Sequence, residues 1–278
     1  MNMSFKMRLT DEAFDELAGN GPVNKTYNEK FDHDREVVNL LLKHSMNEEY
    51  ILDGTAVQTF AYSQKKYDIF LSHSHKDIDK AKRLAKWLED EFGLKVFVDS
   101  LVWMNCDDLL KGIDDLYCKE NDSLYSYEKR NYSTSHVHMM LATALAEAMD
   151  RSKCVLFYNT PHFTEIRSDG EISGNHADHE KQITSSPWIY YEIHMVKLLK
   201  PKPSIRMYNS AEIPRGVQIE YSIGDQLHQI HSLSKEVLLE WQKSWREKKD
   251  KKIDPLKLLC RLWYDSIQKD SSYKVTTN

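Results

Sequence analysis

Short apolar runs alternate with helical patterns between residues 66 and 208. Three of the runs have the length of strands that are buried on both faces, at residues 67–71, 95–98 and 153–158. Between the first two runs, apolar residues recur at three- and four-residue spacing, which predicts a helix that Gly93 ends. Strand, helix and strand within about 30 residues form a βαβ unit. The sequence therefore predicts a parallel α/β sheet.

The chain between the second and third strands is long and rich in polar residues and tyrosine. We expect a helix at residues 109–117, an exposed insertion at residues 120–134 and a packed helix at residues 138–149. After the third strand, residues 165–182 are hydrophilic and are expected to form a loop. Ser186 and Pro187 then cap and open another helix.

Helical patterns flank this central region on both sides. Short helices are predicted at residues 10–17 and 32–44, with glycine and proline between them. Near the end of the chain, two amphipathic helices are predicted, and the second has Asp254 as its cap and Pro255 at its first position. We expect an N-terminal extension at 1–62, an α/β domain at 63–210 and a C-terminal helical extension at 211–278.

The overall composition is that of a globular protein without a nucleic-acid or membrane partner. The net charge is −5, and the one strongly basic run, residues 246–252, is mixed with acidic residues. The four cysteines have no CxxC spacing, and Cys154 lies inside an apolar strand, where it is expected to be a small buried side chain. No signal-peptide core or membrane-spanning run is present, so a cytoplasmic location is expected.

Polar side chains follow each of the three predicted strands. In a parallel sheet, the ligand crevice lies at the carboxyl ends of the strands, where hydroxyls, carboxylates and helix N-termini can hold ribose and phosphate groups. The residues at these ends are Ser72, His73 and Ser74, then Asp99 and Ser100, then Asn159 and Thr160. The competing interpretation is that such residues only cap the helices that follow, as Asp77 is expected to do.

Glu192 follows Trp188 by four residues, so both side chains share one face of the predicted helix. The other residues of this helix are largely apolar and aromatic. A carboxylate on a buried face requires a partner or a function, because burying a lone charge is costly. The alternative is a glutamate at the solvent rim of an amphipathic helix.

Four of these segments, in this order, resemble the motif series of Toll/interleukin receptor (TIR) domains. The segments are KYDIFLSHSHKD, GLKVFVDS, DRSKCVLFYNT and SPWIYYEI. The resemblance covers roughly residues 66–210 and implies a flavodoxin-like parallel sheet flanked by helices. It leaves residues 1–62 and the C-terminal helices unexplained.

The resemblance also implies roles for individual residues. Glu192 matches the catalytic glutamate of the NAD-cleaving members, and Trp188 matches the tryptophan that precedes it. Ser72, His73 and Ser74 occupy the loop that lines the nicotinamide-ribose pocket in the family. Asp99 and the loop up to Trp103 match a region that often completes the site across a domain–domain contact, and Trp103 is a candidate for stacking on adenine.

These roles fit the chemistry of cleaving the bond between nicotinamide and ribose. A carboxylate can hold the ribose hydroxyls and stabilise the positive charge that develops on the ring. Nicotinamide is a good leaving group, so neither a metal nor a cofactor is needed, and NAD⁺ is the substrate. The resemblance implies a bacterial enzyme of anti-phage immune signalling that assembles through TIR–TIR contacts. Its product would be ADP-ribose or a cyclic variant, which a downstream effector can sense.

Other functions remain open at the level of sequence. The main alternative is a non-catalytic TIR scaffold that signals by homotypic assembly. A receiver domain would need a clustered acidic pocket, for which Asp99 alone gives little support. Histidine pairs such as His73 and His75 can clamp a metal, but no further ligands are specified. No GxSxG or Cys–His signature of a hydrolase is present.

Overall fold

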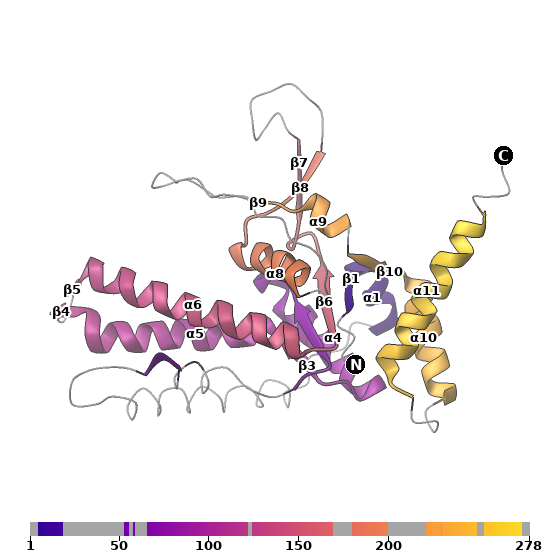
Figure 1. The fold of residues 1–278 in the computed structure, drawn as a ribbon, viewed down its shortest axis with the longest axis horizontal. Coiled ribbons are helices and arrows are strands. Elements are labelled where there is room, and N and C mark those ends of the chain that lie inside the picture. Colours follow the sequence, from indigo (N-terminus) through magenta and orange to yellow (C-terminus); the bar gives the residue numbers. More distant parts are fainter. Residues whose placement is uncertain are drawn as a thin grey trace.

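Five parallel strands form the centre of the computed structural model, which describes residues 5–18, 53–55, 58, 66–121, 124–168, 180–199, 221–228, 230–248 and 253–273. The fold is α/β, with a flavodoxin-like parallel sheet flanked by helices, as predicted (Figure 1). The sheet has the order β10-β1-β6-β2-β3. Its strands are β1 (Phe5–Thr10), β2 (Ile69–Ser72), β3 (Val96–Val98), β6 (Cys154–Asn159) and β10 (His231–Leu233).

The fourth position of the sheet is filled from the N-terminal end of the chain. Flavodoxin-like sheets have the strand order 2-1-3-4-5. Here β3, β2 and β6 fill the first three positions, β1 fills the fourth and β10 the fifth. All six residues of β1 pair with β6, and three of them also pair with β10. The sheet thus draws one strand from the expected N-terminal extension and one from the expected C-terminal extension.

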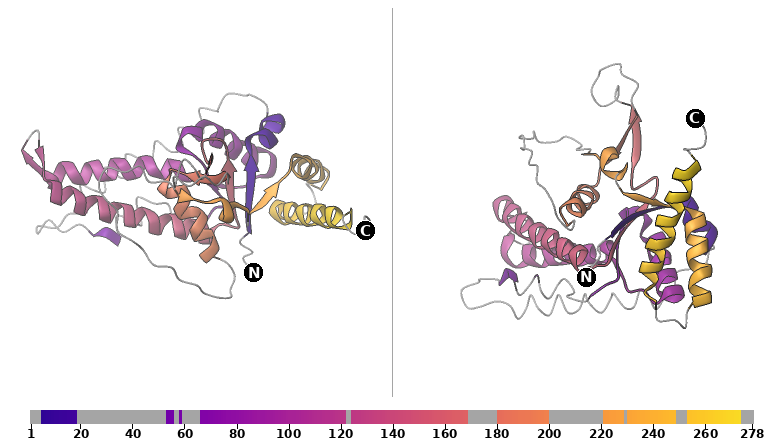
Figure 2. Two further views of the ribbon diagram at one scale, coloured as in Figure 1. Left: turned by 90° about the horizontal axis from the view of Figure 1, so that it is seen from above. Right: turned by 45° about the vertical axis from the view of Figure 1, so that its right-hand side comes forward.

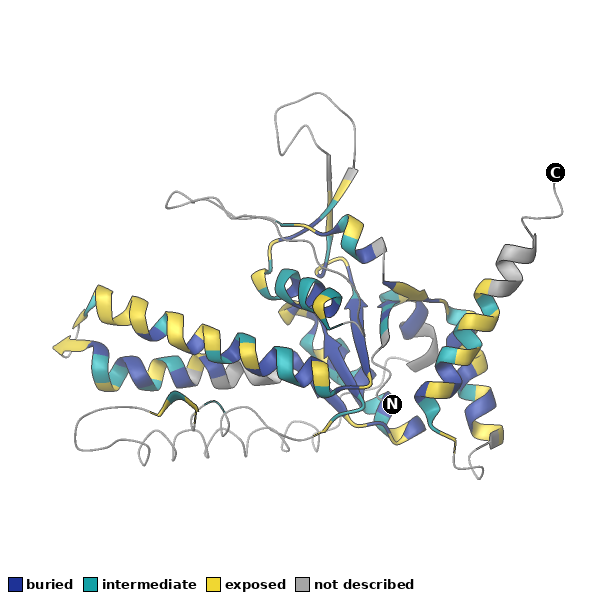
Figure 3. Cartoon of the chain, in the orientation of Figure 1, coloured by how far each residue is buried: buried dark blue, intermediate teal, exposed yellow. Residues whose placement is uncertain are grey.

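Helices cover both faces of the sheet (Figure 2). On one face, α1 (Asp11–Ala18), α4 (Ile78–Phe92), α10 (Lys235–Lys248) and α11 (Pro255–Tyr273) share a hydrophobic core with the sheet. On the other, the core includes α5 (Asp99–Ile113), α6 (Tyr127–Arg151), α8 (Pro187–Leu198) and α9 (Gly224–His228). Side chains alternate along β2, so Ile69 and Leu71 enter the first core and Phe70 enters the second. The strands β2, β3 and β6 are buried between these layers (Figure 3).

A helix from each end of the chain, α1 and α10, packs against α4. Gly93 ends α4 in the left-handed conformation, with φ of 67°. The ring of Trp241 in α10 stacks on Phe92 with centroids 3.7 Å apart, and the indole of Trp245 donates a hydrogen bond to the Glu91 carbonyl. The helix predicted at residues 10–17 corresponds to α1, while the one predicted at 32–44 lies outside the described residues.

A helical hairpin projects from the sheet where an exposed insertion was predicted (Figure 1). The helix α5 already begins at Asp99 and continues as a π-helical turn, Asp114–Cys118. Strands β4 (Lys119–Asn121) and β5 (Leu124–Tyr125) form the tip, and α6 begins at Tyr127. Most of the described residues in the insertion expected over 120–134 are exposed, as predicted, but residues 127–134 are helical. The buried carboxylate of Asp114 accepts hydrogen bonds from Arg130 and Ser133 and anchors the first turns of α6.

A small antiparallel sheet replaces part of the loop predicted at residues 165–182. It contains β7 (Glu165–Ser168), β8 (Glu180–Thr184) and β9 (Tyr221–Ser222). These strands could not be recognised in the hydrophilic sequence because few of their described residues are buried, and those are Ile183 and Thr184 of β8. The strand β8 leads directly into α8. In the described part of the chain, no helix combines the length and the apolar character needed to cross a membrane.

Candidate active site

Glu192 is fully buried on the sheet-facing side of α8. Ser186 caps this helix by accepting a hydrogen bond from the Ile189 amide, and Pro187 occupies the first turn, as the sequence predicts. The buried face carries Ile189, Glu192, Ile193 and Val196. The exposed fraction of Glu192 is 0%. The expectation of a carboxyl group on a buried helix face is confirmed, and the alternative of a glutamate at the solvent rim is wrong.

Ser72 is the polar residue that meets Glu192. It is the last residue of β2, and alternation along the strand turns its side chain toward the face that α8 covers. The Ser72 hydroxyl donates a hydrogen bond to Glu192 Oε2 over 2.5 Å. Ser72 is itself fully buried. The two motifs from opposite ends of the central region therefore meet at the carboxyl edge of the sheet.

His73 and Asp99 form a second buried pair beside them. Asp99 is the first residue of α5, directly after β3, and His73 directly follows β2. The two atoms His73 Nδ1 and Asp99 Oδ1 lie 2.6 Å apart, and the side chains are 0% and 5% exposed. Because β2 and β3 are neighbours, adjacent strand ends bring the imidazole and the carboxyl group together.

The two carboxyl groups influence each other. Burial raises the pKa of Glu192 well above its usual range, and the negative charge of Asp99 raises it further. The hydrogen bond from Ser72 acts in the opposite direction, while a hydrogen bond to Asp99 favours the protonated form of Glu192. Burial and Asp99 thus both favour the protonated form of Glu192, and the two carboxyl groups can share a proton. The site is thus a carboxyl pair flanked by a serine and a histidine.

The other predicted site residues lie at the margin of this group. The Ser74 carbonyl accepts a hydrogen bond from the Asp77 amide and turns the chain into the 3₁₀ helix His75–Asp77. The Trp188 ring packs edge-on against His138 and Tyr191, at centroid distances of 5.8 and 6.1 Å. The expected loop from Asp99 to Trp103 was wrong, because these residues form the start of α5. The Trp103 side chain lies outside the described part of the structure.

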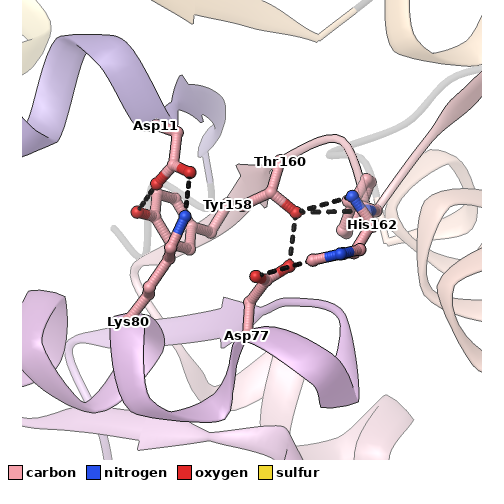
Figure 4. Close-up of polar contacts among 7 residues, drawn as sticks. Asp11, Asp77, Lys80, Tyr158, Thr160 and His162 are labelled. Atoms are coloured by element: carbon pink, nitrogen blue, oxygen red, sulfur yellow. Dashed lines mark hydrogen bonds and ion pairs between the residues drawn. The ribbon is translucent and has the colours of Figure 1, made fainter.

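A second polar cluster lies at the same edge of the sheet (Figure 4). Asp77 precedes α4, as expected of a cap, but its side chain makes no capping hydrogen bond. Instead, Asp77 Oδ2 accepts a hydrogen bond from Thr160 Oγ1 over 2.5 Å, and Oδ1 lies 3.0 Å from His162 Nδ1. Thr160 follows β6, as the sequence predicts, and is buried. His162 was missed, although its position two residues after Thr160 places it at the same strand end.

Asp11 belongs to a neighbouring network that the sequence analysis missed (Figure 4). It follows β1, and its carboxylate accepts hydrogen bonds from the Tyr158 hydroxyl and the Lys80 ammonium group. The network joins β1, β6 and α4. The sequence analysis missed this network because it did not recognise β1, which precedes Asp11.

Neither a metal site nor a reactive cysteine is indicated by the described residues. They contain no group of three or more histidine, cysteine, aspartate or glutamate side chains that can hold a metal ion. Burial raises the pKa of Cys154 well above its usual value, which keeps this thiol protonated, as expected for a small buried side chain.

Comparisons with known proteins return no match: no family model, no curated protein and no solved structure is similar to this chain. The functional conclusion therefore depends on the chemistry of the site. The chemistry offered is that of carboxyl groups and hydroxyls at the carboxyl edge of a parallel sheet.

Proposed function

We propose that the protein cleaves the bond between nicotinamide and ribose in NAD⁺, as an NAD⁺ glycohydrolase or ADP-ribosyl cyclase of the TIR type. One observation carries this proposal. The buried Glu192 carboxyl, from the tryptophan-to-glutamate segment, accepts a hydrogen bond from Ser72, which ends the first strand of the TIR-like motif series. The two segments that resemble TIR motifs most closely thus form one site at the edge where α/β sheets bind ligands.

The reaction follows from the groups present. The C1′–N bond of the ribose breaks, and its electron pair leaves with nicotinamide, which departs as a neutral molecule. Ionised Glu192 stabilises the positive charge that develops on C1′ and the ring oxygen, while Ser72 positions the carboxylate. Water then attacks C1′ and loses a proton to give ADP-ribose. Attack by a nucleophilic atom of the adenine ring gives a cyclic product instead.

The burial of Glu192 implies that the site opens before catalysis. With an exposed fraction of 0%, the carboxyl group touches protein on all sides, and this burial raises its pKa. Substrate entry must separate α8 from the residues after β2. The positive charge of the nicotinamide ring then favours the ionised form of Glu192. Self-association through TIR–TIR contacts supplies a trigger for this opening, and the nucleotide product would signal to a downstream effector in bacterial anti-phage defence.

The same burial favours one alternative, a TIR-type scaffold without turnover. In a scaffold, Glu192 would serve only to join α8 to β2 through Ser72. A buried carboxyl group that is hydrogen-bonded and protonated can serve this purpose without any chemistry. The two functions differ in whether NAD⁺ is consumed.

The test is incubation of concentrated protein with NAD⁺, followed by mass spectrometry of the products. We expect the wild type to release nicotinamide and the Glu192→Gln variant to be slower by about a thousandfold, as when a charge-stabilising group is removed from an active site. The matched control is Glu120→Gln, which changes an exposed glutamate at the tip of the helical hairpin and should leave the rate unchanged. Equal rates for the wild type and Glu192→Gln would contradict the catalytic role. No turnover by the wild type, together with its assembly into filaments, would favour the scaffold.

A further inference from the structure

Asp77, Thr160 and His162 form a cluster that the proposed role of Glu192 does not use. The Asp77 and Thr160 residues are each 3% exposed, whereas the His162 side chain is 52% exposed. The cluster joins the start of α4 to the chain that leaves β6 (Figure 4). The cluster thus lies where the neighbouring strands β2 and β6 end and the chain leaves them toward opposite faces of the sheet. Sheets of the α/β class bind their ligands at such a point.

Hydrogen bonds hold His162 in one orientation. Thr160 Oγ1 accepts bonds from the backbone amides of His162 and Phe163, each over 3.2 Å, and donates one to Asp77. The carboxylate of Asp77 can only accept, so the 3.0 Å contact places the proton on His162 Nδ1. No described residue bonds to Nε2. The ring is therefore anchored through Nδ1, while Nε2 makes no hydrogen bond to a described residue.

The cluster lies close to the Glu192 site but not within reach of the same substrate atom. Ser72 pairs directly with Phe157, and Thr160 lies three residues further along the chain. At roughly 3.3 Å per residue and a strand spacing of about 4.8 Å, Ser72 and Thr160 are about 11 Å apart. Phe163, next to His162, belongs to the same hydrophobic core as Ile189 and Ile193 of α8. The separation between Ser72 and Thr160 is large enough for the ribose of a dinucleotide to lie at one residue and its diphosphate at the other.

We infer that His162 binds the diphosphate of the nucleotide whose ribose lies at Glu192. This inference rests on the proposed function and names the group that would hold the substrate's anionic centre. A protonated imidazole donates from Nδ1 to Asp77 and from Nε2 to a phosphate oxygen, a charge-assisted bond. The exposed Lys76 directly precedes Asp77 and adds a positive charge near the cluster.

The test is calorimetric titration with ADP and, separately, with adenosine, which lacks the diphosphate. Replacing His162 by alanine should weaken ADP binding about tenfold, the loss of one charge-assisted hydrogen bond, and leave adenosine binding unchanged. Thr160→Val keeps the histidine but removes the hydroxyl that positions it, and should produce a smaller loss for ADP only. His136→Ala is the matched control, because His136 is exposed on the helical hairpin and stacks only on Tyr132 among the described residues.

Three outcomes would overturn the inference: no ADP binding by the wild type, unchanged ADP affinity in His162→Ala, or an equal loss for ADP and adenosine. Circular dichroism confirms that each variant is folded. The failure of the proposed function is separately visible, because the wild type would then release no nicotinamide, or would release it at the same rate as Glu192→Gln. If the wild type releases no nicotinamide while His162→Ala loses ADP affinity, the protein has a nucleotide site without glycohydrolase chemistry.

Discussion

Two aspartate–histidine pairs lie at the same edge of the sheet and differ chiefly in burial. In the first, His73 Nδ1 lies 2.6 Å from Asp99, and the side chains are 0% and 5% exposed. In the second, His162 Nδ1 lies 3.0 Å from Asp77, and the side chains are 52% and 3% exposed. The same chemical pair is thus enclosed by protein in one place and open to solvent in the other.

The difference in burial gives the two aspartate–histidine pairs different roles. Asp99 acts on a neighbouring carboxyl group, because its charge raises the pKa of Glu192. Asp77 instead accepts a hydrogen bond from Thr160 and fixes the orientation of the half-exposed His162 ring. Under the proposed function, the buried pair would adjust the electrostatics of the carboxyl group that acts on the substrate, and the open pair would present a donor to the same ligand.

The largest expected effect is on stability, when each histidine is replaced by alanine. His73→Ala leaves Asp99 buried beside Glu192 without its imidazole, and breaking a buried pair in this way costs about 3 kcal/mol or more of unfolding free energy. His162→Ala should cost less than about 1 kcal/mol, because its ring is half exposed and Asp77 keeps the hydrogen bond from Thr160. Urea unfolding measures both values.

The comparison between the pairs fails if the two variants lose equal stability. A larger loss for His162→Ala would mean that the open cluster, and not the buried one, holds the strand ends together. The denaturant slope m must stay constant among the proteins, since a change in slope would indicate a different unfolded or native state.

The sheet was partly predictable because continuous apolar runs indicate buried strands. The runs that became β2, β3 and β6 are continuous and were recognised, whereas β1 was missed. In β1 the apolar Met7 and Leu9 alternate with Lys6 and Arg8, and the strand lies far from its partners in the sequence. The alternation was a usable signal, but six residues are too few to separate a strand from a polar terminus. The position of β1 between β6 and β10 depends on tertiary packing.

The buried site was predictable because it follows from strand ends and helix spacing. Ser72, His73, Asp99 and Glu192 were all named from the sequence, and the structure brings them together. The pairing within the group was not predictable, since it depends on the order of β2 and β3 in the sheet. His162 was missed for another reason. A histidine after an Asn-Thr-Pro turn has no distinctive pattern, and only the contact with Asp77, 85 residues away, marks it.

A smaller expected effect is the pH dependence of the stability difference between Glu192→Gln and the wild type. Burial raises the folded-state pKa of Glu192, so its stabilising protonation is complete below the unfolded value of about 4.3 and is lost as pH rises through the folded pKa. Glutamine cannot ionise and can still accept the bond from Ser72. The variant should therefore melt higher than the wild type at pH 8, by about 3 °C for a gain of about 1 kcal/mol.

The direction of the difference in Tm at high pH is the part of this prediction that tests it most directly. The difference in Tm should shrink as pH falls and vanish near pH 4, where Glu192 is protonated in both states. Glu120→Gln, at an exposed position, should show no such trend. A variant that melts below the wild type at pH 8 would show that ionised Glu192 stabilises the fold, in conflict with its burial beside Asp99.

The smallest expected effect is a change in the pH dependence of NAD⁺ cleavage when Asp99 is replaced by asparagine. If ionised Glu192 performs the reaction, kcat/KM falls as pH decreases through the pKa of this carboxyl group. The charge of Asp99 raises that pKa, and asparagine removes the charge while still offering an oxygen to His73. The acid limb of the Asp99→Asn profile should therefore move to lower pH, so that this variant retains a larger share of its maximal rate than the wild type at pH 5. His162→Ala, which acts on the open pair, should leave the position of this limb unchanged. A limb that moves with His162 and not with Asp99 would reverse the roles assigned to the two pairs.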